Sequence, residues 1–184
     1  MFQSTPGGRY LSVNPALARM YGYASPEELL GSVTDISHEI YVDPDCREAL
    51  TRLLERQGVV RRFEYEVYRK DGSTIWISES VRAVRNEEGE ILYYEGTIED
   101  ITERRRAEEE RERLAAMIES SNDAIMSLTE DRVSFWNPAA EKLFGYSSEE
   151  ILGKSVNILV PSHLRGKVER NVERILRGER IQDY

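Results

Sequence analysis

The alternation of apolar and polar residues marks three consecutive strands within the first hundred residues. Residues 63–67 alternate strictly, with Phe, Tyr and Val at every second position, which is the period of a half-buried strand. Two further strands are predicted over residues 73–85 and 91–98, where apolar and β-branched residues are frequent. Asp71-Gly72 is typical of a two-residue hairpin turn, and the polar segment 86–89 separates the second strand from the third. The pattern predicts an antiparallel three-stranded meander.

Three short helices are predicted before this meander, each after a capping signal. Asn14, Ser25 and Asp43 can each accept a hydrogen bond from the first helical turn, and each is followed by a proline, which suits the first helical position. The third helix is expected to end near Arg56. Short β-prone segments, one of them at residues 10–13, precede the helices. Strands, then helices, then an antiparallel meander are typical of the α+β class.

The chain also contains an internal repeat. Asn-Pro-Ala, Gly-Tyr and Glu-Glu-Leu-Leu-Gly follow one another within residues 14–31, and the same order recurs within residues 137–153, with Ile for the first Leu of the last motif. Between the two copies lies the segment 103–114, in which ten of twelve residues are Arg or Glu. Two related units joined by a charged segment are the simplest account of this pattern.

The charged segment is predicted to be a helix. Thr102 can cap it, and its apolar seam consists of Ala107, Leu114 and Ile118. Opposite charges four residues apart support a helix by about 0.2–0.5 kcal/mol per pair. Two interpretations stay open: a solvated helix that joins two domains, or a short parallel coiled coil in a dimer. The expected pairs are Arg104–Glu108, Arg105–Glu109, Arg106–Glu110 and Glu109–Arg113.

These motifs, taken together and in this order, resemble the PAS family of sensory domains. Two further features carry the resemblance: the segment Arg69–Ser73 with Trp76 downstream, and Asp100-Ile101-Thr102, which is similar to the Asp-Ile-Thr signature that closes PAS domains. The resemblance implies a five-stranded antiparallel sheet with short helices on one face. A connecting signalling helix and an incomplete second PAS-like unit are expected to follow.

The resemblance divides the chain into three parts. Residues 1–102 correspond to a PAS domain with its closing PAC motif, residues 103–118 to a charged helical linker, and residues 119–184 to the N-terminal part of a second PAS domain. Residues 180–184 correspond to residues 61–65, so the second unit lacks the meander of the first. We therefore expect the second unit to be loosely packed, or to borrow strands from a neighbouring chain.

Composition narrows the possible partners. The chain has 184 residues, with 34 acidic and 25 basic side chains and a formal net charge of −9, so its surface repels phosphate backbones. We expect no nucleic acid as a partner and no direct contact with a membrane. The single cysteine excludes an internal disulfide and a zinc site built from cysteines, and with only two histidines a histidine-rich metal centre is not expected. The protein is expected to be cytoplasmic. No catalytic domain is expected in this chain, because motifs for a catalytic nucleophile and for phosphate binding are absent from the sequence.

The resemblance raises the question of cofactors, because PAS-like domains can hold haem, flavin or small metabolites. A haem-binding member is expected to carry an axial histidine on the third helix, but residues 44–58 contain none. In the second unit Val168 lies about where that ligand would be, and His163 lies a few residues earlier. Flavin photosensors of the superfamily use an Asn-Cys-Arg-Phe motif, whereas Cys46 lies in Asp-Cys-Arg-Glu on a different helix. Haem and flavin are therefore disfavoured, and no metal site is expected.

An unidentified small metabolite remains open as a ligand. The strand at residues 63–67 and the helical segment expected to face it provide aromatic and aliphatic side chains. These side chains either fill the core of a small domain or surround a small polar ligand. The candidate pocket residues are Tyr41, Leu50, Leu53, Leu54, Phe63, Tyr65 and Val67.

The expected function is sensory signal relay. A change in the first sheet would alter the helix that leaves it, with Asp100, Ile101 and Thr102 as the hinge. The resemblance implies a multidomain signal transducer, such as a sensor histidine kinase or a diguanylate cyclase, whose output domain lies downstream of this segment. A homodimer is expected. The alternative is a constitutive dimerisation scaffold that binds no ligand.

Overall fold

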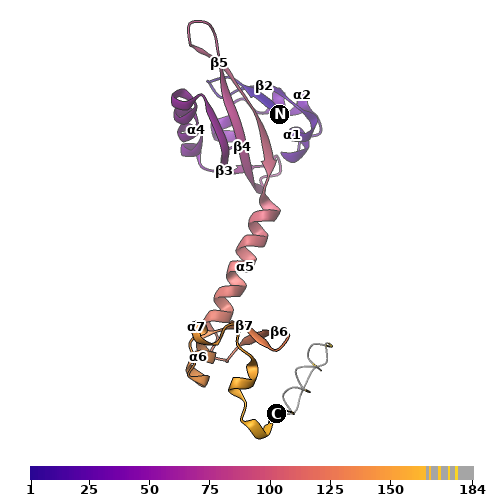
Figure 1. The fold of residues 1–184 in the computed structure, drawn as a ribbon. Coiled ribbons are helices and arrows are strands. Elements are labelled where there is room, and N and C mark those ends of the chain that lie inside the picture. Colours follow the sequence, from indigo (N-terminus) through magenta and orange to yellow (C-terminus); the bar gives the residue numbers. More distant parts are fainter. Residues whose placement is uncertain (165, 167–169, 171–173, 175–176, 178–184) are drawn as a thin grey trace. The chain divides into compact units, whose positions relative to one another are not determined.

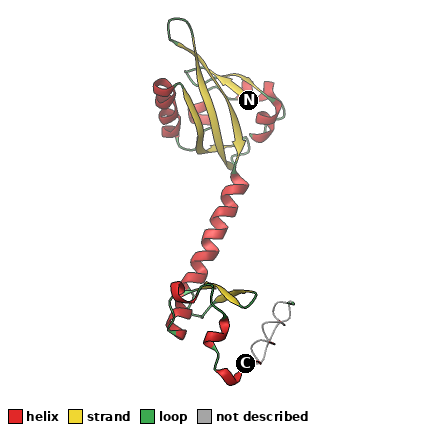
Figure 2. Cartoon of the chain, in the orientation of Figure 1, coloured by secondary structure: helices red, strands yellow, loops and turns green. Residues whose placement is uncertain are grey.

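In the computed structural model, residues 1–164, 166, 170, 174 and 177 are described. The chain forms two compact units, residues 1–108 and residues 109–184. Figure 1 traces the chain through both units, and Figure 2 separates helices from strands. Each unit is described by itself below. Among the described residues, no helix combines the length and apolar character needed to cross a membrane.

The first unit is built on a five-stranded sheet, as predicted. Its strand order is β2-β1-β5-β4-β3, and every neighbouring pair is antiparallel. The short first strand therefore lies between the second strand and the last, while the meander forms the other side of the sheet. The strands are β1 (Phe2–Ser4), β2 (Tyr10–Val13), β3 (Val59–Tyr68), β4 (Thr74–Arg85) and β5 (Ile91–Asp100).

Four helices connect β2 to β3 and cover the buried side of the sheet. The side-chain oxygens of Asn14, Ser25, Asp35 and Asp43 accept hydrogen bonds from the first turns of these helices, which confirms the three capping signals and adds a fourth. Leu50 and Leu54 project from the longest helix into the core and are completely buried. The helices are α1 (Pro15–Met20), α2 (Pro26–Ser32), α3 (Ile36–Glu39) and α4 (Pro44–Gln57).

The turn between β3 and β4 differs from the two-residue hairpin expected from Asp71-Gly72. The backbone N–H of Arg69 donates to the carbonyl oxygen of Ser73 at 2.7 Å, so three residues lie between the last bonded pair. Asp71 explains the difference, because its Oδ1 accepts hydrogen bonds from the N–H of Ser73 at 2.9 Å and from its hydroxyl at 2.6 Å. Gly72 adopts φ +82°, which closes the longer turn.

Helix α5 (Thr102–Ser120) follows β5 and buries none of its side chains. Two expectations about it were wrong. The hydroxyl of Thr102 does not cap it; Oδ1 of Asp100 accepts the N–H of Thr102 at 2.9 Å instead. Of the four expected ion pairs within this fully described helix, only Arg104–Glu108 forms, at 3.7 Å. The exposed pairs lose more side-chain freedom than their screened attraction returns, and Arg105 contacts the sheet instead.

The second unit contains a two-stranded antiparallel sheet and short helices. Trp136 and Ile151 are buried in a small cluster with Val133, whereas Leu143 and Phe144 are 69% and 38% exposed. The expected strand over residues 180–184 lies outside the described residues. Gly145 ends its helix in the left-handed conformation. The elements are β6 (Met126–Thr129), β7 (Arg132–Trp136), α6 (Pro138–Phe144), α7 (Ser148–Ile151), η1 (Val156–Leu159) and η2 (Ser162–Leu164).

Candidate functional site: a buried polar cluster and the start of helix α5

Two of the predicted pocket residues meet in the core of the first unit. The rings of Tyr41 and Tyr65 stack with their centroids 4.4 Å apart and their planes 6° from parallel. Tyr65 comes from β3, and Tyr41 comes from the segment after α3, which is bound to the same strand. The N–H of Val42 donates to the carbonyl of Glu66 at 3.1 Å, and Tyr41 forms a short antiparallel bridge with Val67. Backbone pairing therefore holds the two phenols together.

Both phenols donate hydrogen bonds to one buried carboxyl group. Glu79 on β4 is 1% exposed, and its Oε2 accepts the hydroxyl of Tyr41 at 3.5 Å and the hydroxyl of Tyr65 in a shorter bond. Burial raises the pKa of Glu79, because removal from water disfavours the charged form; the hydrogen bond from Tyr65 and the charge of Arg47 oppose this shift. Glu79 is therefore a buried acid whose protonation state depends on its surroundings.

A buried guanidinium belongs to the same cluster. Arg47 lies on the inward side of α4 with Leu50 and Leu54, and only 7% of its surface is exposed. Its guanidinium carbon lies 5.6 Å from the centroid of the Tyr94 ring, a cation–π contact. Within the described residues, Nη2 of Arg47 and Oγ of the fully buried Ser4 have no hydrogen-bond partner. The core thus contains polar groups whose bonding capacity is not used.

These groups surround a small cavity. Its volume is about 10 Å³, close to the smallest volume that accommodates one water molecule. Its polar lining includes Ser4, Arg47 and Glu79. Of the predicted pocket residues, only Tyr41 and Tyr65 line it; Leu50, Leu54 and Val67 are buried in the surrounding core, while Leu53 and Phe63 are partly buried against it. A guest larger than one water molecule would require the helices to move away from the sheet.

Glu79 and Arg47 were missed from the sequence, although a signal was present. In β4 every second residue from Ile75 to Val81 is buried, so Glu79 occupies an inward position in the alternation. In α4 the spacing of residues 47, 50 and 54 places Arg47 on the same helical face as two leucines. The periodicity thus indicates that both side chains point into the core. Only the fold shows that the two charged residues lie in the same cluster.

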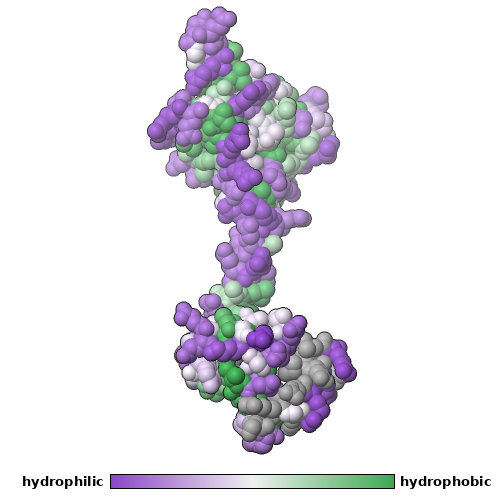
Figure 3. All heavy atoms as spheres, viewed as in Figure 1, coloured by the Kyte–Doolittle hydropathy of each residue, from purple (hydrophilic) through white to green (hydrophobic). Residues whose placement is uncertain are grey.

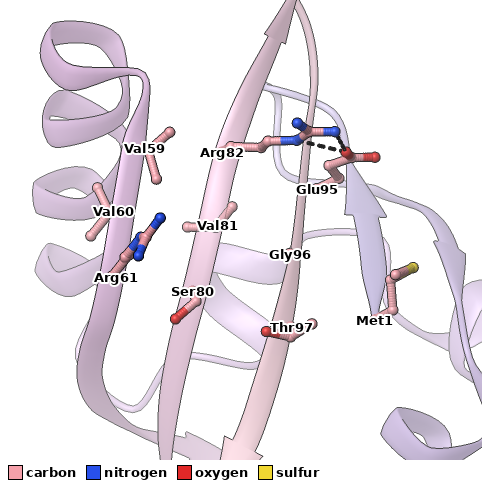
Figure 4. Close-up of a pocket in the computed structure, with 10 residues that line it drawn as sticks. All are labelled: Met1, Val59, Val60, Arg61, Ser80, Val81, Arg82, Glu95, Gly96 and Thr97. Carbon is pink, nitrogen blue, oxygen red and sulfur yellow. Dashed lines mark hydrogen bonds and ion pairs between the residues drawn. The ribbon is translucent and has the colours of Figure 1, made fainter.

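A larger and more open pocket lies on the outer face of the same sheet (Figure 4). Its volume is about 280 Å³, and residues of β3, β4 and β5 line it together with Met1. Arg82 and Glu95 form an ion pair across two neighbouring strands at its edge. None of the predicted pocket residues lines it, because their side chains point to the opposite face of the sheet.

The predicted hinge residues form a well-defined junction between the sheet and α5. The N–H of Ile101 donates to the carbonyl oxygen of Trp76 at 2.9 Å, and the N–H of Trp76 donates to Oγ1 of Thr102 at 3.0 Å. The ladder between β4 and β5 therefore continues one step beyond the end of β5, with a side chain in place of the backbone acceptor. Ile101 is 4% exposed, and Asp100 binds the N–H of Thr102 and the guanidinium of Arg69.

The first turn of α5 also lies against the outer face of the sheet. Glu64 on β3 accepts hydrogen bonds from Arg104 at 2.7 Å and from Arg105 at 3.1 Å. These two bonds hold the pKa of Glu64 below its usual value. The guanidinium of Arg105 also stacks over the indole of Trp76, 4.0 Å from its centroid. Side chains of β3 and β4 therefore determine the direction in which α5 leaves the sheet.

The residues weighed as cofactor ligands are dispersed. Cys46 is partly buried near Asp43, and burial raises the pKa of its thiol. His163 is exposed, and Val168 lies outside the described residues. Among the described residues, no group of three or more His, Cys, Asp or Glu side chains could hold a metal ion.

Comparison with known proteins relates both units to one family. The PAS domain pattern matches residues 1–103, and the PAS fold pattern matches residues 112–182. Sensor protein FixL of Bradyrhizobium diazoefficiens is 27% identical over 157 residues, 79% of this chain and 31% of that protein. The probable diguanylate cyclase DgcE of Escherichia coli is 30% identical over 118 residues, 64% of this chain and 10% of that protein.

One solved structure illustrates the structural comparison. A sensory box histidine kinase/response regulator from Burkholderia thailandensis is 28% identical, with a TM-score of 0.46, and the match covers 62% of this chain and 88% of that one. The present chain spans less than a third of the length of the two curated relatives named above.

Proposed function

The chain belongs to the PAS family of sensory domains, and from this premise we propose that its first unit relays a signal from the buried polar cluster to helix α5. The main support is the location of both ends of the path on one strand. Glu79 lies on the inward face of β4, and Trp76, three residues earlier, lies on the outward face and binds Ile101 and Thr102. A shift of β4 would therefore move the start of α5.

The core is suited to generate such a shift. Interiors are close-packed, so they transmit displacement rather than absorb it. A change in the charge of Glu79 would alter the hydrogen bonds of Tyr41 and Tyr65, and so would a ligand that binds Nη2 of Arg47. Those phenols connect β4 to β3 and to the segment after α3. The signal is thus proposed to be a change in polar bonding inside the first unit.

The output is proposed to lie in a domain that α5 and the second unit connect to the first. The similarity to the probable diguanylate cyclase DgcE and to the Ectopseudomonas mendocina sensor histidine kinase TmoS supports a cyclase or kinase output in the parent protein. The rival proposal is a dimerisation scaffold that responds to no ligand. A melting temperature that responds to metabolites favours sensing, whereas a tight dimer indifferent to them favours the scaffold.

We further propose that the first unit works without haem or flavin, with an unpigmented small polar ligand as the candidate guest. The small volume of the cavity and the absence of histidine from residues 44–58 support this. The purified protein is expected to show no absorption band between about 350 and 600 nm beyond scattering. A Soret or flavin band that survives gel filtration would contradict the proposal.

The relay can be tested by changing Glu79 and observing α5. Glu79→Gln removes the charge and keeps the shape, and two-dimensional proton–nitrogen spectra of the full chain are compared with those of the wild type. We expect amide shifts to change at residues 101–105. Glu48→Gln is the matched control, because it makes the same substitution at an exposed position of the first unit, outside the buried cluster. Unchanged signals at residues 101–105 in Glu79→Gln would refute the relay.

A further inference from the structure

One buried amide in the second unit joins the end of α5 to the rest of that unit. Asn137 is 0% exposed. Its Nδ2 donates to the carbonyl oxygen of Ile118 in the last turn of α5 at 3.1 Å, and to that of Asp123 at 2.9 Å. Its Oδ1 accepts the N–H of Ile125 at 2.8 Å and the N–H of Ala140 at 2.9 Å. A single side chain therefore contacts the preceding helix, the loop before β6 and the first turn of α6.

This arrangement uses the whole bonding capacity of an amide side chain. Two N–H donors and two acceptor positions are each occupied. The backbone of Asn137 adds a fifth bond, from its N–H to the carbonyl of Ile125 at 3.1 Å. The loss of both donors would leave the carbonyl oxygen of Ile118 with only the N–H of Ser121, at 3.4 Å, and the carbonyl oxygen of Asp123 with no hydrogen-bond partner among the described residues. The position of the last turn of α5 is thus fixed relative to β6 and α6.

The first unit contains the same motif and the same capping bond. Asn14 begins the first Asn-Pro-Ala copy, and its Oδ1 accepts the N–H of Leu17 at 3.0 Å to cap α1. The N–H of Asn14 donates to the carbonyl oxygen of Met1 at 3.1 Å, as the N–H of Asn137 does to that of Ile125. Capping alone therefore requires one bond of the amide. The two bonds that Asn137 donates are additional, and one of them goes to α5.

We infer that Asn137 is the positioning residue through which a movement of α5 reaches the second unit. The inference rests on the proposed relay through α5. Packing ties the end of α5 only weakly to the rest of the second unit, because none of its side chains is fully buried and, of residues 109–120, only Ile118 is partly buried. Among the described residues, the bond from Asn137 to Ile118 is the side-chain hydrogen bond between α5 and the body that contains β6, β7 and α6. Displacement of α5 would be transmitted along this bond.

The test separates this coupling from helix capping. Asn137→Asp keeps the oxygen acceptor, and Asp caps a helix as well as Asn does, but both donors to carbonyl oxygens are lost. Asn137→Ser, which also caps but carries no added charge, is the second variant. Asn14→Asp is the matched control in the first unit. Backbone amide exchange is measured for residues 118–122 and for α6 in the full chain.

Exchange at residues 118–122 is expected to accelerate about tenfold in both Asn137 variants, while the amides of α6 keep their wild-type rates. Asn14→Asp should leave residues 118–122 unchanged. Equal acceleration throughout α6 would indicate a merely structural role and overturn the inference, as would unchanged exchange at residues 118–122.

Transmission is tested in the same variants by adding Glu79→Gln. In the wild-type background, Glu79→Gln is expected to shift amides of α5 and of β6. With Asn137→Asp, the shifts at residues 101–105 should persist and those of β6 should disappear. If the β6 shifts persist, Asn137 is not the coupling residue. If residues 101–105 do not respond in any background, the proposed relay fails; the exchange measurement then still decides whether Asn137 holds the end of α5.

Discussion

The backbone N–H of Trp76 and the hydroxyl oxygen of Thr102 are hydrogen-bonded at 3.0 Å, and this bond joins the central part of the sheet to the first residue of α5. Thr102 thereby accepts the bond that a further residue of β5 would have accepted. The sheet thus continues into the helix without a flexible linker, because Ile101 between them is buried and bonded to the same tryptophan.

Replacing this hydroxyl should loosen the junction. Thr102→Val keeps the shape but leaves the N–H of Trp76 without an acceptor, which typically costs about 1–3 kcal/mol. We expect a lower free energy of unfolding for the first unit in denaturant, together with faster amide exchange at Trp76. Thr102→Ser keeps the acceptor and should remain close to the wild type. Equal stability of the Val and Ser variants would contradict this role of the hydroxyl.

Glu79 should lower the free energy of unfolding as the pH rises, which is opposite to the effect of a carboxyl group whose folded pKa is lowered. Because its folded pKa is raised, the unfolded chain ionises first, near the ordinary value of about 4.3. The contribution of Glu79 is fully present below that pH and is lost as the pH rises through the folded pKa. The free energy of unfolding of Glu79→Gln should therefore rise relative to that of the wild type across this window.

This difference is measured by urea titrations at a series of pH values, with the exposed Glu99→Gln as control. A gap between the wild type and Glu79→Gln that stays constant with pH would contradict the burial of an ionisable Glu79.

Strand alternation predicted the three-stranded meander, and caps followed by proline predicted three helices, because both are local signals; the five-stranded sheet was implied by the resemblance to PAS domains. The resemblance to the Asp-Ile-Thr signature placed Asp100, Ile101 and Thr102 at the end of the sheet, where the structure has them, and their role as a hinge stays a prediction. The partners of the junction were not predictable in this way: Glu64 approaches Arg104 only because β3 lies next to β4. Long-range pairing likewise redirected Arg105 from its helical partner to the sheet. Local periodicity predicts whether a side chain faces the core or the solvent, whereas the fold determines which polar groups contact one another.

A homodimer that involves α5 remains a prediction. Leu114 and Met117 are 48% and 59% exposed, and on the face shown in Figure 3 apolar side chains gather near the C-terminal end of an otherwise hydrophilic helix. Changing Leu114 and Ile118 together to Glu should shift the sedimentation coefficient from dimer to monomer at tens of micromolar. Glu112→Gln, on roughly the opposite side of the helix, is the control. A wild-type protein that sediments as a monomer would refute the prediction.

The most direct test of the relay is a pH titration of the full chain followed by nuclear magnetic resonance. The carboxyl carbon of Glu79 and the amides of residues 102–105 are observed in the same samples. We predict that these amides follow the ionisation of Glu79, with a midpoint above the range of Glu64, whose pKa is lowered. This component should vanish in Glu79→Gln. Amides of residues 102–105 that ignore the ionisation of Glu79, or that titrate identically in the variant, would contradict the account.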